Sequence, residues 1–570
     1  MNTELLGVIT TYLLSIMLAY PLGRHIAKVY KGERNWMDFM APLERLILRF
    51  SGVDAQREMN WKDFLKALLT INLVWFVYGF FMLLFQGKLP FNPDGNPGMT
   101  PDLAFNTVIS FVVNCNLQHY SGESGLTYLS QITVIMFFQF VSAATGMAAL
   151  AGLYRALREQ TSGTIGNFYD YFVKSLTRIL LPLAIVVATI LIFNGTPMTF
   201  DGKETITTLE GNEQAISQGP AAAIIAIKQL GTNGGGYFGV NSSHPLENPN
   251  YLTNMVEIIA ILLIPIAMVF ALGFYLNRKK LAWIIFGVMT FFFLIFAATS
   301  IYFEVNGNPA ITKMGISQPT GSMEGKEVRF GPAASALWGI ATTSTSNGSV
   351  NAMHDSMTPM SGAMQMLDMM INALYGGVGV GLLNYYIFLI VAVFISGLMV
   401  GRTPEFLGKK VEAREVKIAA LITLLSPLLI MGGTAISSYI FVNYPEAAWT
   451  VQPGNWLNNP GYHGFSEMLY EYTSANANNG SGFEGLGDNN FFWNFTTGII
   501  LILGRYLPII GPVAIAGLLA QKKYIPESAG TLPTDSVTFG AMTFAVIVII
   551  TALAYFPALA LGPLAEWLGM

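Results

Sequence analysis

Four short polar segments recur along this 570-residue chain, each between apolar stretches. They are Asn116-Leu117-Gln118, Thr232-Asn233-Gly234, Ser346-Asn347-Gly348 and Asn478-Asn479-Gly480. Their third residues lie 116, 114 and 132 positions apart (118 to 234, 234 to 348, 348 to 480), and such spacing indicates four repeated units. Because backbone carbonyls around one axis can replace the water shell of a small cation, these twelve residues are the predicted selectivity filter.

Glycine occupies the third position in three of the segments, at Gly234, Gly348 and Gly480. It tolerates backbone angles that other residues avoid and allows close approach of a neighbouring chain. The first segment has Gln118 there, so one quarter of the ring is expected to be chemically distinct. A single segment of this kind is typical of an ordinary turn, but four at matched positions favour a shared ring.

Acidic residues and histidines lie near the four segments. The acids predict a vestibule that raises the local cation concentration, with ordinary solvated loop charge as an equal alternative; they are Glu123, Glu247, Asp355 and Glu471. The histidines are expected to form hydrogen bonds rather than bind metal, since none has His-x3-His spacing; they are His119, His244, His354 and His463. The single cysteine, Cys115, excludes a disulfide within the chain.

The composition is that of a membrane protein. Hydrophobic residues make up 53% of the chain and charged residues 11%, whereas a soluble protein has about 25% charged residues. The net charge of −4 gives no basis for nucleic-acid binding. The sequence contains neither a G-x-x-x-x-G-K-[ST] motif nor Asp-Lys-Thr-Gly-Thr, so the energy for any active transport is expected from a partner chain or an ion gradient. No covalently bound cofactor is expected.

Ten segments are long and apolar enough to cross a bilayer, which takes about 20 residues. They are 4–23, 64–87, 128–154, 171–194, 254–277, 281–303, 364–401, 417–442, 493–521 and 538–560. The segment 364–401 is too long for one straight span, and glycines lie in its middle, at Gly376, Gly377, Gly379 and Gly381. These glycines predict a broken helix, which lipid allows only where protein or water covers the freed backbone.

Lysine and arginine are distributed unevenly between alternate loops. One set of loops carries 23 of the 30 and the other set six, and Arg505 lies within a span. Positive loops face the cytoplasm, so both termini are predicted outside, with 4–23 as a retained first helix.

Arg505 is a functional candidate, because a charge within a span is costly. It could lie below the filter, repelling a cation or anchoring an anionic group, or its side chain could extend to the nearer interface.

The predicted fold is an all-α polytopic membrane protein with four pseudo-symmetric helix–pore loop–helix repeats around one central pore. Shorter apolar stretches precede the polar segments, at 104–113, 221–230 and 333–341, and fit re-entrant half-helices. The predicted divisions are 1–63 (extra helix and cytoplasmic loop), 64–160, 168–280, 281–410 and 415–523 (the four repeats) and 524–570 (extra C-terminal helix).

Several longer motifs resemble the family of potassium-binding A subunits (KdpA) of the bacterial Kdp potassium-transporting ATPase, within the superfamily of K⁺ transporters. The matching stretches are Thr232-Asn233-Gly234-Gly235-Gly236, His244-Pro245-Leu246-Glu247-Asn248-Pro249, Gly401-Arg402-Thr403-Pro404-Glu405, Gly408-Lys409-Lys410, His463-Gly464-Phe465-Ser466-Glu467, Gly530-Thr531-Leu532-Pro533-Thr534 and Phe556-Pro557-Ala558-Leu559-Ala560-Leu561-Gly562-Pro563. Asn347 stands where the family leads us to expect a small residue or cysteine.

The resemblance implies a division of labour in the bacterial inner membrane. This chain would select K⁺ as the transported ion, and a KdpB-like P-type ATPase subunit would hydrolyse ATP and receive K⁺ through an intramembrane tunnel. A single-span C subunit and a very small F subunit would complete the complex. The break at Gly376–Gly381 would block direct passage.

Three alternatives differ from this hypothesis. The first is a free-standing K⁺ channel or K⁺/Na⁺ symporter of the same architecture, and the second is a broken-helix transporter for an organic solute. The third is a membrane scaffold without a bound ion.

Overall fold

The computed structural model describes residues 3–401, 403–526 and 533–570. Two of the motifs above reach outside these residues, at Arg402 and at Gly530, Thr531 and Leu532. Within the described chain, ten helical spans are long and apolar enough to cross a membrane, which confirms the predicted number. The protein is therefore a helical multi-pass membrane protein.

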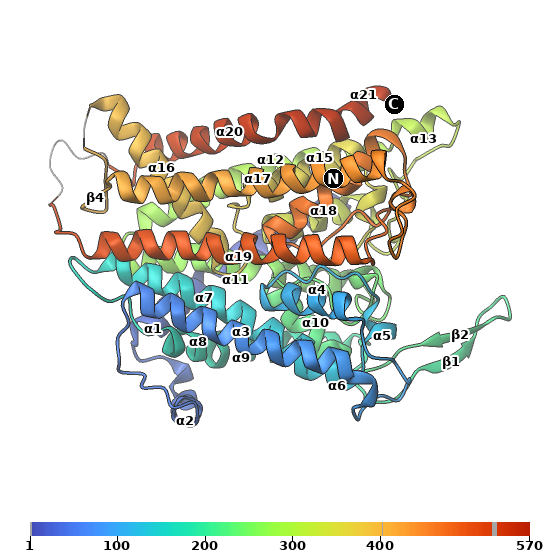
Figure 1. The fold of residues 1–570 in the computed structure, drawn as a ribbon, viewed down its shortest axis with the longest axis horizontal. Helices are drawn as coiled ribbons and strands as arrows, with labels where there is room; N and C mark the ends of the chain where they lie inside the picture. The colour runs from blue at the N-terminus through green and yellow to red at the C-terminus, as the bar shows by residue number, and fades with distance from the viewer. Residues whose placement is uncertain (1–2, 402, 527–532) are drawn as a thin grey trace.

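The long helices run side by side across the molecule (Figure 1). They are α1 (Thr3–Lys31), α3 (Trp61–Phe85), α7 (Phe137–Arg158), α8 (Phe168–Ser175) with α9 (Leu181–Phe193), α11 (Tyr251–Leu276), α12 (Lys279–Asn306), α16 (Val380–Val400), α17 (Ala413–Asn443), α19 (Phe491–Ala520) and α20 (Val537–Leu559). Three are joined to or continued by π-helical turns, which are η3 (Gln131–Met136), η4 (Leu176–Leu180) and η8 (Ala560–Leu564).

Shorter helices fill the connections. The α-helices among them are α2 (Ala41–Phe50), α5 (Gly122–Gly125), α6 (Tyr128–Ser130), α13 (Pro309–Lys313), α15 (Pro359–Ile371) and α21 (Ala565–Gly569). The 3-10 turns are η1 (Trp36–Met40), η2 (Gln86–Lys88), η5 (Asn241–Ser243), η6 (His354–Ser356) and η7 (Pro453–Asn455). Two small antiparallel hairpins, which the sequence did not predict, pair β1 (Glu204–Thr207) with β2 (Glu213–Ile216) and β3 (Glu405–Phe406) with β4 (Lys409–Lys410).

Four half-length helices precede the polar segments. They are α4 (Pro101–Val112), α10 (Ala221–Leu230), α14 (Gly331–Ser344) and α18 (Gly461–Ala477). At 1.5 Å per residue, α10 is about 15 Å long, half of the hydrocarbon thickness. Each lies between two long helices in chain order, so the predicted sequence of helix, pore helix, loop and helix is present four times, with α1 and α20 outside it. The exact division of the chain at 63, 160, 280, 410 and 523 stays a prediction.

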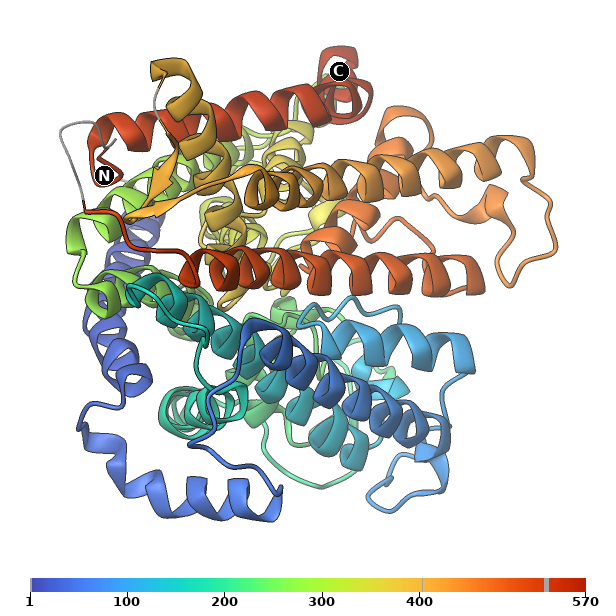
Figure 2. The same cartoon turned by 60° about the vertical axis from the view of Figure 1, so that its left-hand side comes forward.

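The two ends of the helix array differ. The hairpin β1–β2, α13 and the marked C-terminus lie at one end, whereas α2 and β4 lie at the other (Figure 1). Both views show the first part of the chain, in blue and cyan, below the last part, in orange and red (Figure 2). Segments far apart in sequence therefore pack side by side, as α4 and α19 do.

The predicted break in the segment 364–401 is confirmed. Helix α15 ends at Ile371 and α16 begins at Val380, so eight residues have no regular structure. Positive φ angles at Asn372, Tyr375, Gly376 and Gly379 (48°, 61°, 68° and 84°) turn the chain there. Glycine accepts this region without the steric cost that other residues bear.

Candidate functional site

The four loops form a closed ring in which each loop touches the next. A β-carbon placed on Gly234 would lie 2.0 Å from the carbonyl oxygen of Asn347. One on Gly348 would lie 2.2 Å from the oxygen of Asn479, and one on Gly480 would lie 2.4 Å from that of Cys115. These distances leave no room for a side chain, so glycine is required for the loops to approach.

The contact that closes the ring joins the second loop to the first. A β-carbon on Gly235 would lie 2.2 Å from Oε1 of Gln118. Gln118 Oε1 accepts a hydrogen bond from the Gly236 N–H at 2.6 Å, and its Nε2 donates to the Gly236 carbonyl at 3.1 Å. Gln118 thus links the two loops through its side chain.

The first loop is out of register with the prediction by two residues. One or two residues after each half-helix comes a residue with positive φ, and the N–H of the next residue donates to the carbonyl five positions earlier. The residues with positive φ are Asn114, Thr232, Ser346 and Asn478 (63°, 48°, 51° and 51°). The residues that donate their N–H are Cys115, Asn233, Asn347 and Asn479. The equivalent of Thr232-Asn233-Gly234 is therefore Asn114-Cys115-Asn116, and the predicted Asn116-Leu117-Gln118 is wrong as an alignment.

Asn116 takes the place of glycine in this loop. Its φ is 70°, against 75°, 89° and 108° at Gly234, Gly348 and Gly480. Asparagine is among the few residues that tolerate this region. The position could have been found by counting from the end of the half-helix rather than by matching residue types.

The middle residues fix the ring to the half-helices behind it. Asn347 Nδ2 donates to the Lys228 carbonyl at 3.0 Å, and Asn479 Nδ2 donates to the Thr342 carbonyl at 2.7 Å. Asn233 Nδ2 donates instead to Oδ1 of Asn114 at 2.7 Å. The Asn347 side chain therefore supports the neighbouring repeat.

A cavity of about 480 Å³ opens above the ring. Its acidic lining includes the predicted Glu471 and also Glu327, Glu484 and Asp488, which the sequence analysis missed. The other three predicted acids are absent from the described lining, so the prediction is wrong for Glu123, Glu247 and Asp355.

These three acids have other partners. Glu247 is fully buried and forms an ion pair with the equally buried Lys228. Glu123 Oε2 accepts from the Gly239 N–H at 2.7 Å, and Asp355 lies 3.0 Å from His463 Nε2.

His119 lies buried behind the first loop, between two acids of the cavity. Its Nε2 lies 3.2 Å from Glu471 Oε1 and 3.9 Å from Asp488 Oδ2, and its Nδ1 lies 2.7 Å from Asn494 Oδ1. Burial opposes its protonation, but Asp488 and Glu471 outweigh burial and raise the pKa of His119 to about 9. It is therefore a cation at neutral pH.

The broken helix lies directly against the ring. The Val378 N–H donates to Thr232 Oγ1 at 3.0 Å, and the Gly376 N–H donates to the Ser344 carbonyl at 2.8 Å. On its other side the break packs on α7, where a β-carbon on Gly379 would lie 2.1 Å from the Gly146 carbonyl oxygen. Two glycines of the predicted set thus pack against α14 and α7.

Arg505 lies in this same layer and is 3% exposed. Its Nη2 donates to the Ser142 carbonyl at 3.3 Å, and its Nη1 would lie 3.9 Å from a β-carbon on Gly377. The alternative in which its side chain reaches the interface is therefore wrong.

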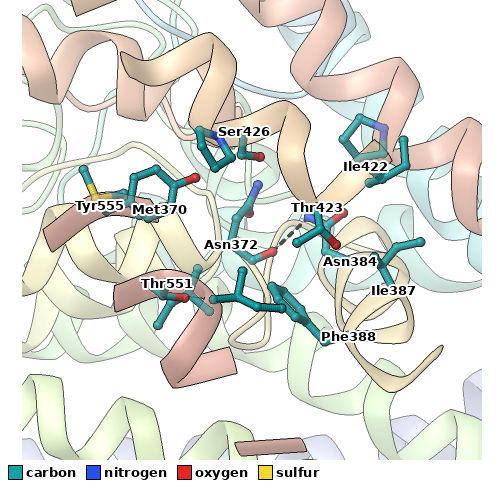
Figure 3. Close-up of a pocket in the computed structure, with 14 residues that line it drawn as sticks. Met370, Asn372, Asn384, Ile387, Phe388, Ile422, Thr423, Ser426, Thr551 and Tyr555 are labelled. Carbon is teal, nitrogen blue, oxygen red and sulfur yellow. Dashed lines mark hydrogen bonds between the residues drawn. The ribbon is translucent and has the colours of Figure 1, made fainter. Parts of the chain in front are cut away.

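A second, small cavity of about 40 Å³ lies beside the break (Figure 3). Asn372 and Asn384 lie at its centre, joined by a hydrogen bond of 2.9 Å from Asn384 Nδ2 to the Asn372 carbonyl. Further polar side chains come from α17 and α20, at Thr423, Ser426, Thr551 and Tyr555. Such a space is large enough for a few water molecules.

The family model of the potassium-transporting ATPase A subunit, KdpA, matches residues 9–568. The chain belongs to the KdpA family. A potassium-transporting ATPase potassium-binding subunit of Flavobacterium johnsoniae is 68% identical over 100% of this chain and 99% of its own length. The subunit of the same name from Geobacillus kaustophilus is 45% identical over 98% of both chains.

The fold also resembles a solved structure of low sequence identity. The crystal structure of the potassium transporter TrkH from Vibrio parahaemolyticus matches with a TM-score of 0.51 and 15% identity, over 90% of this chain and 98% of that one. The likeness supports the fold alone. In this KdpA family member, the ring is built from Asn114–Asn116 and the three polar-Asn-Gly loops.

Substituting a ring glycine should disrupt ion binding. Gly348→Ala would force a side chain into a positive-φ position at a cost of about 1–3 kcal/mol, and the β-carbon would meet Asn479. We expect K⁺ affinity to fall roughly ten- to hundredfold, as measured by calorimetry on the purified full chain. Gly287→Ala, in α12 with open space around it, is the matched control. Equal affinities in the two variants would contradict the ring.

The charge on His119 should make stability depend on pH. A pKa raised from 6.5 to about 9 in the folded chain contributes about 3 kcal/mol below pH 6.5, and this contribution is lost as pH rises through 9. We expect the stability difference between wild type and His119→Gln to shrink between pH 6.5 and 9.5, as followed by thermal unfolding in detergent. A difference that stays constant over this range would oppose the assignment.

Proposed function

We propose that this chain selects K⁺ at the ring and delivers it to a KdpB-like P-type ATPase subunit in the bacterial inner membrane, with both termini outside. A single-span C subunit and a small F subunit complete the proposed uptake complex. The observation that carries the proposal is the closed contact of four loops, three through their ring glycines and the first through Gln118. The names of the relatives, which are potassium-binding subunits, support it.

Selection would depend on main-chain oxygens held at fixed positions. The first and third residues of each loop have positive φ angles, and the amides of Asn347 and Asn479 fix two loops to neighbouring half-helices. A cation that enters the ring exchanges water oxygens for backbone oxygens, and acids in the cavity above raise its local concentration.

The layer below the ring favours transfer to a partner over direct passage. The break at Gly376–Gly381 contacts the loops, and the buried Arg505 lies against it, so we infer that both hinder direct passage. A positive charge there opposes the straight path of K⁺. The small cavity beside the break offers polar groups toward α17 and α20, so we place the exit on that side. A free-standing channel or symporter of the same fold is the second candidate.

Gln118→Arg tests the ring. A guanidinium beside Gly236 would put a fixed positive charge at the ring, so K⁺ affinity should fall at least about tenfold. The control is Gln521→Arg, at the exposed end of α19. The measurement is K⁺-stimulated ATP hydrolysis by the complex co-purified with this chain. Unchanged K⁺ dependence in Gln118→Arg would remove the filter assignment, and K⁺ flux by the chain alone without ATP would favour the channel.

Thr423→Phe tests the exit. The larger side chain would fill the cavity beside the break, so K⁺ binding should persist while K⁺-stimulated ATP hydrolysis falls at least about tenfold. The matched control is Leu424→Phe, because Leu424 is the next residue of α17 and is 65% exposed. Normal ATP hydrolysis in both variants would refute this route and leave the ring untouched.

A further inference from the structure

A cluster of metal-ligating side chains lies apart from the ring, where three outer elements meet. His463 and Glu467 stand at i and i+4 in the first turns of α18 and therefore share one face. Asp355 comes from η6, the turn that follows the third loop. One ligand atom from each of the three lies within 4.8 Å of the others.

The histidine is already oriented as a metal-binding histidine would be. Its Nδ1 lies 2.8 Å from Glu566 Oε1 in α21, and its Nε2 lies 3.0 Å from Asp355 Oδ1. A carboxylate on one ring nitrogen fixes the ring and leaves the other nitrogen for the metal, as in many zinc sites. Here that other nitrogen points into the cluster.

Glu467 supplies independent support for a ligand at this cluster. Its side chain is fully buried, and Oε1 accepts from Asn459 Nδ2 at 2.9 Å. Its Oε2 has no hydrogen-bond partner among the described residues. A buried carboxylate oxygen without a partner costs free energy, which a bound cation would remove.

The charges around the cluster are mostly negative. Asp355, Glu467 and Glu566 surround the single histidine, and Glu484 accepts from the N–H groups of His354 and Asp355 at 3.4 and 3.1 Å. Asn459 Nδ2 also donates to Asp355 Oδ2 at 3.2 Å, so it links the two carboxylates. One imidazole nitrogen and two carboxylates form a mixed donor set that suits Zn²⁺ and similar ions.

We propose that Asp355, His463 and Glu467 bind a divalent transition-metal ion such as Zn²⁺, with water completing the coordination. When the metal binds, any proton on Nε2 leaves to solvent, and the nitrogen lone pair becomes the metal ligand. The metal ties the outer end of α18 to the turn after the third loop and, through Glu566, to the C-terminal helix α21. This site is separate from the ring, so it does not depend on K⁺ selection.

The test is Zn²⁺ binding to the metal-stripped full chain in detergent at constant K⁺, measured by calorimetry and by metal content after gel filtration. We expect one Zn²⁺ at this cluster and a higher unfolding temperature when it is bound. Glu467→Gln and His463→Gln should each weaken the affinity at least about tenfold, and Glu566→Gln about ten- to hundredfold.

Two variants separate binding from folding and from the other histidine cluster. Glu467→Gln removes a buried charge at nearly constant shape, so the metal-free chain should unfold at an unchanged or higher temperature. His119→Gln, which alters the cluster with Glu471 and Asp488, should leave the affinity at Asp355–His463–Glu467 unchanged. No Zn²⁺ uptake by the wild type, equal affinity in Glu467→Gln, or loss only in His119→Gln would each overturn the proposal.

Discussion

Lipid offers no hydrogen-bond partners to the peptide groups of a loop, so irregular backbone exists inside a bilayer only where protein covers it or where it lines a water-filled cavity. Four loops meet this condition together in this structure. Each half-helix stops within the molecule, and its last carbonyls receive the N–H groups of the loop that follows. Side-chain amides of Asn347 and Asn479 then bond to carbonyls of the preceding repeat. Each loop of the ring therefore depends on contacts with the adjacent loop or repeat for its conformation.

The second requirement is that backbone segments approach each other closely. Glycine permits this both in the ring and in the broken helix beside it. In the ring, Gly234, Gly348 and Gly480 lie against the carbonyl of the next loop. One layer lower, Gly376 packs on Gly381, and Gly379 packs on Gly146 of α7. Because both layers share Thr232, whose hydroxyl accepts from the Val378 N–H, a shift of the broken helix changes the ring directly.

Charged side chains pair with one another behind and around the loops. Lys228 with Glu247 and Lys326 with Glu304 are fully buried ion pairs behind the loops, and two histidines each lie among carboxylates. Removing one member of such a pair leaves an uncompensated buried charge, which costs far more than an exposed pair contributes. Lys326, Glu471 and Asp488 also line the cavity at the ring, so part of this charge network faces that cavity.

The sequence by itself determined the ten spans, the half-length helices, the break near Gly376–Gly381 and three of the four loops, because hydropathy and glycine act within a few residues. Only the tertiary structure decided the register of Asn114–Asn116, the buried pairing of Glu247, the depth of Arg505 and the meeting of Asp355 with His463. Each depends on contacts between residues that are far apart in the chain, or on where a helix ends in space. Residue type and spacing carry no information about such contacts.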